Sequence, residues 1–125
     1  MNSQAYKDRM LNRDRLRLAV ARFMADNSLD AVFYPHQKVL VVPAGSRDQF
    51  ERNGTLSNST GYPAVTFQAG YSTPTGTAPR GVPVGAELLG SDYSEARLLA
   101  FAYAFEQATQ VRKPPASTPP LPSEP

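Results

Sequence analysis

A run of eight consecutive apolar residues near the carboxyl end constrains the fold more than any other feature. It occupies positions 98–105, with the sequence LLAFAYAF. Asp92 followed by Glu95 resembles a capping box, and Ser94 is an alternative N-cap. We therefore expect a helix that starts in this region and ends near Thr109. A helix that is apolar nearly all round is normally enclosed by protein on most of its sides.

The remaining sequence offers too little material to enclose such a helix. It predicts one further helix and a few short strands, which can cover one face of the apolar helix or slightly more. A large apolar patch would then remain exposed, and soluble monomers seldom have one. We therefore expect the chain to be part of something larger, either a piece of a larger domain or a subunit that buries this helix in a partner.

The positions of glycine and proline divide the chain into segments. All eight glycines lie between Gly45 and Gly90, and six of the twelve prolines lie at positions 114–125. The first 34 residues and the stretch 91–113 contain neither residue type, so they are the two helical segments. Apolar residues at helical spacing predict a first helix from about Ser3, its N-cap, to Asn27.

The sequence of the middle segment predicts strands and loops. Residues 30–34, apolar on both faces and followed by Pro35, predict a short buried strand. Residues 39–42 form another apolar run, and 43–63 form a long segment without periodicity that predicts a functional loop or a surface packed against missing protein. Residues 64–69 and 82–89 alternate as strands and could pair as a long-looped hairpin.

The segments together indicate an α/β fold with a proline-rich end. Pro83 should lie at a strand start or where no ladder donor is needed. Residues 113–125 predict an extended tail, because proline at this density cannot continue a helix. We therefore assign residues 1–112 to one incomplete domain and residues 113–125 to the tail.

Composition and charge exclude several classes of function. The chain has no cysteine and a single histidine, His36, which excludes thiol chemistry and a multi-histidine metal centre. Residues 1–28 carry six cations and three acids, but the acids interrupt the run and few aromatic residues accompany it. This pattern indicates a solvated helix face rather than a nucleic-acid site. We expect no membrane span, no metal, no cofactor and a cytoplasmic location.

A few polar residues have the potential for chemistry. His36 follows a strand end, where it is either a polar loop residue or part of a pocket. Lys38 with Ser57 or Ser59 is the one pair that could form a Ser–Lys dyad, although a turn at 57–61 is a sufficient explanation of both serines. Glu87 lies among apolar residues, so we expect it to be buried in a structural ion pair, with either Arg80 or Arg97 as its partner.

Several blocks of sequence follow one another in a specific order and spacing: LSNSTGYPAVTFQAG at 56–70, RGVPVGAELLG at 80–90, YSEA at 93–96 and YAFEQAT at 103–109. Together these blocks resemble the carboxyl-terminal end of the amidase signature family. The upstream DAVFYP at 30–35 and the ending at 112–121 also resemble the family, so the likeness covers roughly residues 5–121. Gln68 departs from it, since the family usually has proline there. The resemblance implies a fragment of the family's mixed-sheet α/β fold.

The same resemblance implies amide-bond hydrolysis, or transfer of ammonia from glutamine. The family uses a serine nucleophile, a second serine as proton relay and a lysine base, and none of the motifs that carry these residues is present. No catalytic residue can therefore be assigned. The loop 35–60 lies toward the substrate side in such enzymes, which makes His36, Gln37 and Asn58 candidates for substrate lining.

These inferences leave three readings of the function. The first is a carboxyl-terminal portion of an amidase-type hydrolase that is inactive alone, its partner being the remainder of the domain. The second is a separately encoded subunit that completes an amidase supplied by another chain. The third is a non-enzymatic interaction module that uses the basic helix or the proline-rich tail. The sequence alone leaves open whether the chain is itself an enzyme.

Overall fold

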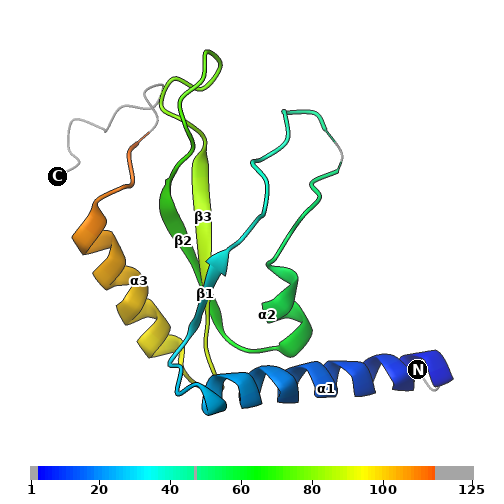
Figure 1. The fold of residues 1–125 in the computed structure, drawn as a ribbon. Helices are drawn as coiled ribbons and strands as arrows, with labels where there is room; N and C mark the ends of the chain where they lie inside the picture. The colour runs from blue at the N-terminus through cyan, green and yellow to red at the C-terminus, as the bar shows by residue number, and fades with distance from the viewer. Residues whose placement is uncertain (1–2, 47, 115–125) are drawn as a thin grey trace, which may run out of the picture.

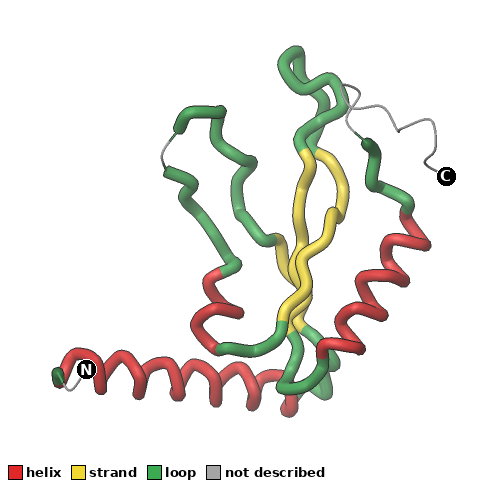
Figure 2. Tube along the Cα trace, turned by 180° about the vertical axis from the view of Figure 1, so that it is seen from behind, coloured by secondary structure: helices red, strands yellow, loops and turns green. Residues whose placement is uncertain are grey.

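The computed structural model of the protein describes residues 3–46 and 48–114. Three helices surround a small antiparallel sheet (Figure 1). The helix α1 lies across one end of the sheet, and α3 and α2 lie on opposite sides of it, as the reverse view also shows (Figure 2). The elements, in order, are α1 (Gln4–Asp26), β1 (Val32–Pro35), α2 (Thr55–Thr60), β2 (Ala64–Tyr71), β3 (Pro83–Leu89) and α3 (Glu95–Thr109).

The first helix forms as the sequence predicts. The Ser3 side chain accepts a hydrogen bond from the backbone N–H of Tyr6, which satisfies one of the free donors at the helix start. Met24 is the buried residue of α1, and most of the helix is exposed. Among the helices and strands, α1 contacts mainly α2, while its amino-terminal half projects beyond the sheet (Figure 1).

The sheet has the strand order β1–β3–β2, with β3 paired antiparallel to both neighbours. The predicted hairpin of β2 and β3 is confirmed, with Pro83 at the start of its strand. The predicted strand at 30–34 begins later, at Val32, and includes Pro35. Proline is tolerated there because β1 is an edge strand within the described sheet.

The interpretation of residues 43–63 as a loop throughout is wrong at one point, because α2 lies inside it. Serine, threonine and asparagine are weak helix formers, so the local sequence gives little helical signal. Gly61 ends the helix in the left-handed conformation, with a φ of 71°, that glycine adopts without strain. Arg17 Nη1 donates to the carbonyl oxygen of Thr60 at 2.8 Å, so α1 satisfies a free acceptor at the end of α2. Tertiary contacts therefore stabilise this helix.

The start of α3 also differs from the predicted capping box. Ser94 occupies the N-cap position without a side-chain capping bond, and Asp92 forms an ion pair with Arg17 instead. The body of the helix packs one side against the sheet, where Phe67 contacts Phe105 with ring centroids 5.0 Å apart. Leu98 is 1% exposed, whereas Leu99 is 60% and Tyr103 64% exposed. The expectation of an incompletely covered apolar helix is confirmed.

The hydrophobic core of the described residues is small. Of the residues that the structure describes, six hydrophobic ones are buried, whereas sixteen large hydrophobic ones are exposed. The buried set comprises Met24, Tyr62, Ala86, Leu88, Leu89 and Leu98. The apolar run 39–42 forms neither helix nor strand and is largely exposed. The described fold therefore has more apolar surface than its own elements cover.

The predicted tail lies mostly outside the described residues, which end at Pro114. Its first two residues contact the hairpin. Tyr71 Oη lies 3.3 Å from both the backbone nitrogen and the carbonyl oxygen of Lys113, and Arg80 donates to the carbonyl oxygen of Pro114 at 2.9 Å. The division into residues 1–112 and 113–125 stays a prediction.

We expect Arg17 to contribute most to the packing of α1 against the rest of the chain. Its guanidinium binds Thr60 and Asp92 and stacks over the Tyr62 ring at 4.3 Å from the centroid. We expect Arg17→Ala to lower the urea midpoint of the chain measured by circular dichroism. Arg15→Ala, at an exposed position of the same helix, is the matched control and should leave the midpoint unchanged. Equal midpoints for the two variants would contradict this role.

Candidate functional site

A buried carboxylate lies at the centre of the sheet. Glu87, in the middle strand β3, is 2% exposed and faces Tyr34 across the β1–β3 ladder. Tyr34 Oη donates to Glu87 Oε1 at 2.5 Å, and His36 Nδ1 lies 2.7 Å from Glu87 Oε2. Each carboxylate oxygen therefore has a hydrogen-bond partner, which a buried charge requires.

The surroundings of Glu87 determine its ionisation. Burial acts to raise the pKa of Glu87, but the hydrogen bonds from Tyr34 and His36 outweigh it and hold the pKa below its ordinary value. Burial and the hydrogen bond to Glu87 raise the pKa of Tyr34. Glu87 is consequently a carboxylate, and Tyr34 a neutral phenol, at neutral pH.

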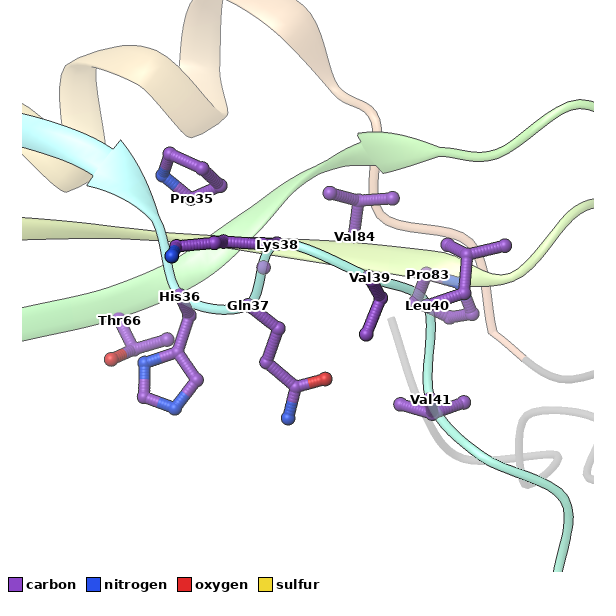
Figure 3. A pocket seen from close by; sticks show the side chains of 11 residues that line it. Pro35, His36, Gln37, Lys38, Val39, Leu40, Val41, Thr66, Pro83 and Val84 are labelled. Atoms are coloured by element: carbon purple, nitrogen blue, oxygen red, sulfur yellow. The ribbon is translucent and has the colours of Figure 1, made fainter. Parts of the chain in front are cut away.

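A cavity of about 460 Å³ opens beside this cluster (Figure 3). We call it the His36 cavity. The side chains of His36 and Gln37 extend toward the same side of the chain in this view. The other lining residues are mostly apolar: Pro35, Lys38, Val39, Leu40, Val41, Thr66, Pro83, Val84 and Gly85. A largely apolar wall with a few polar groups at one end is typical of a small-molecule site.

The structure brings together two of the three predicted substrate-lining residues. His36 and Gln37 line the His36 cavity, whereas Asn58 lies on the exposed side of α2 and is not among the lining residues. Contact of any of the three with a substrate stays a prediction.

The expected partners of Glu87 are wrong. Arg97 instead pairs with Asp30, and Arg80 binds the Pro114 carbonyl group. Residues that face each other across two paired strands are close neighbours, and Tyr34 faces Glu87 in the β1–β3 register. Knowledge of this register would have identified Tyr34 as the partner.

Lys38 does not meet the serines with which a dyad was considered. Its Nζ lies 3.2 Å from Glu51 Oε2 in an exposed ion pair, while Ser57 Oγ donates to the carbonyl oxygen of Gly54. The described residues contain no cluster of three or more potential metal ligands, and none of their helices is long and apolar enough to cross a membrane. Hydrogen bonding and acid–base chemistry are what the described cluster can supply.

A second groove, of about 440 Å³, lies between β2 and α3. It is lined by the half-buried Phe67 of β2 and by the exposed Leu99 and Tyr103 of α3, together with Glu106 and Arg112. The apolar surface left over from α3 is therefore continuous with the outer edge of the sheet.

Solved structures with the same fold are much longer than this chain. An amidase family protein from Bacillus anthracis str. Ames matches with a TM-score of 0.68 and 24% identity, over 92% of this chain and 19% of its own. PAM12A matches with a TM-score of 0.66 and 27% identity, over 92% of this chain and 23% of its own. The described fold is thus similar to a segment of a larger fold.

Curated sequences give the same result. A probable amidase from Arabidopsis thaliana is 46% identical over 55 residues, which are 44% of this chain and 10% of the relative. Over this region the chain resembles members of the amidase signature family. A glutamyl-tRNA(Gln) amidotransferase chain from Heliobacterium modesticaldum is 43% identical over 56 residues, again 10% of its length. No family model matches the chain. The sequence likeness therefore covers 44% of this chain in the first of these relatives, whereas the fold likeness covers 92% of this chain.

Proposed function

We propose that this chain forms the carboxyl-terminal part of an amidase-type amide-bond hydrolase and does not hydrolyse amides by itself. The observation that carries the proposal is the asymmetry of the structural match. Amidase-fold neighbours cover 92% of this chain, yet this chain covers only 19–23% of them. Most of such an enzyme must therefore be supplied by other polypeptide, from the same gene or from a separate subunit.

The uncovered apolar surface supports this proposal independently. Leu99 and Tyr103 on the outer side of α3 are exposed, and they continue into the groove beside β2. Apolar patches of this kind mark surfaces that other protein covers. We infer that the remainder of an amidase domain covers this side of α3. The expected cytoplasmic location stays a prediction.

The chemistry available to the chain also supports inactivity alone. The family mechanism that the sequence resembles needs two serines and a lysine base. Lys38 is exposed and forms an ion pair with Glu51, so it is not held against a serine as a general base. The contribution of this chain would then be one wall of the substrate cavity and a packing surface.

Amide hydrolysis by the purified chain provides the test. We expect no turnover of simple carboxamides above the buffer rate, measured as ammonia release. Measurable turnover that Lys38→Ala abolishes would contradict the proposal and support a Ser–Lys dyad within the chain; Lys7→Ala is the matched control, because Lys7 is exposed on α1.

The neighbouring DNA separates the two forms of the proposal. A lysine and a glycine- and serine-rich segment encoded in frame upstream would place the whole enzyme in one polypeptide. The same motifs in a separate intact reading frame would indicate a two-chain enzyme. Absence of both would remove the catalytic partner that the proposal requires.

A further inference from the structure

The His36–Glu87 contact fixes which imidazole nitrogen carries a proton. Glu87 is held as a carboxylate, which can only accept hydrogen bonds, so His36 Nδ1–H must donate across the 2.7 Å contact to Oε2. The other oxygen, Oε1, is occupied by the Tyr34 hydroxyl group. In neutral His36, Nε2 then has a free lone pair and is a hydrogen-bond acceptor.

The fold also restricts the orientation of the His36 ring. A Cβ atom placed on Gly54 would lie 2.3 Å from His36 Cε1 and 3.0 Å from Nε2, so the backbone before α2 lies directly against the ring. Only glycine leaves room for the imidazole in this position. None of the described residues forms a hydrogen bond with Nε2, whereas His36 lines the cavity.

We propose that the His36–Glu87 pair forms a hydrogen-bond-accepting site in the His36 cavity, for the N–H of a carboxamide with an apolar substituent. His36 Nε2 accepts from the amide N–H, and Glu87 is the positioning residue that keeps the proton on Nδ1. The Gln37 side-chain amide, in the same cavity, donates to the ligand carbonyl oxygen. Val39, Leu40 and Val84 supply the apolar contact. The amide class rests on the proposed function, whereas the proton position rests on the His36–Glu87 contact and on Glu87 being a carboxylate.

The first experiment reads the proton position. His36 is the only histidine, so long-range ¹H–¹⁵N correlation of the purified chain reports its tautomer without ambiguity. We expect the Nδ1–H form in the neutral state, whereas free histidine in water favours Nε2–H. Tyr34→Phe removes the other bond to the same carboxylate and should keep the Nδ1–H form. Glu87→Leu removes the acceptor, so this variant should lose the Nδ1–H form. Gly54→Ala should also lose the Nδ1–H form, because the added methyl group displaces the ring.

An Nε2–H tautomer in the unmodified chain would overturn the proposal, whatever the variants do. The same holds if Gly54→Ala and Glu87→Leu both fold, by their amide spectra, and both keep the Nδ1–H form. If Glu87→Leu does not fold, the tautomers of the unmodified chain and of Gly54→Ala still test the proposal.

The second experiment reads the ligand. Hexanamide and methyl hexanoate have apolar chains of equal length, but only the amide has an N–H donor. At a pH where His36 is neutral, we expect hexanamide to shift the His36 ¹⁵Nε2 resonance in a saturable manner. Methyl hexanoate should bind about tenfold more weakly, since it leaves the acceptor unpaired. Equal affinity for the two, or no binding of hexanamide, would overturn the proposed ligand class.

A His36→Phe variant supplies the matched control. It should lose the preference for hexanamide over the ester, followed at the Val84 methyl groups, while keeping apolar binding. These readings use the chain alone and no turnover. Failure of the acceptor site is therefore distinguishable from failure of the proposed function, which the ammonia assay and the upstream DNA decide.

Discussion

Glu87→Ala should lower the free energy of unfolding by about 3 kcal/mol, because the Tyr34 hydroxyl group and the Nδ1–H of His36 lose their hydrogen-bond acceptor. Urea denaturation of the purified chain at pH 7 measures this. Glu106→Ala, at an exposed position of α3, is the matched control and should change the free energy by less than about 0.5 kcal/mol.

The same carboxylate gives the stability a defined pH dependence. The folded-state pKa of Glu87 lies below its ordinary value of 4.5, so the folded state binds the proton less well than the unfolded state. Its contribution is therefore complete above pH 4.5 and is lost as the pH falls through the lower folded-state pKa. We expect the stability difference between the unmodified chain and Glu87→Gln to shrink below pH 4.5. A difference that grows on acidification would show that Glu87 is protonated in the folded state.

Leu98→Ala should cost about 3 kcal/mol, since Leu98 is 1% exposed at the junction of α3 with the sheet and its truncation leaves a cavity. The Leu98 methyl groups would lie 3.1 and 3.2 Å from a Cβ atom on Gly90, which places the side chain tightly against the end of β3. The measurement is again the free energy of unfolding of the purified chain in urea.

The adjacent residue is the control for this variant. Leu99→Ala makes the same chemical change in the same helix, so both variants share the same change in helix propensity. Because Leu99 is 60% exposed, it should cost less than about 0.5 kcal/mol. Equal losses for the two variants would show that the outer side of α3 is covered in solution, for example by a second copy of the chain. Repeating the measurement at several protein concentrations would identify such self-association.

Local sequence patterns predicted the longest elements well. The Ser3 cap and the periodicity after it gave α1 almost to the residue, and alternation gave the β2–β3 hairpin. Such signals are local, because a cap bond or an alternating strand face involves residues close in sequence. The resemblance of several blocks to the amidase signature family agrees with the related structures and sequences.

Long-range contacts account for what local patterns missed. The helix α2 depends on Arg17, which is 43 residues away from Thr60. Asp92 pairs with the same Arg17 instead of capping α3. The expectation that Glu87 pairs with Arg80 or Arg97 failed because both arginines have partners elsewhere.

The sequence by itself determined the two long helices, the hairpin and the presence of more apolar surface than the chain can cover, since each follows from spacing along the chain. Only the tertiary structure decided which groups surround Glu87. Tyr34 and His36 lie 53 and 51 residues from it and meet it through antiparallel pairing of β1 with β3 and the turn that follows. Register between distant strands depends on the whole fold, because any single strand satisfies its own alternation at several registers.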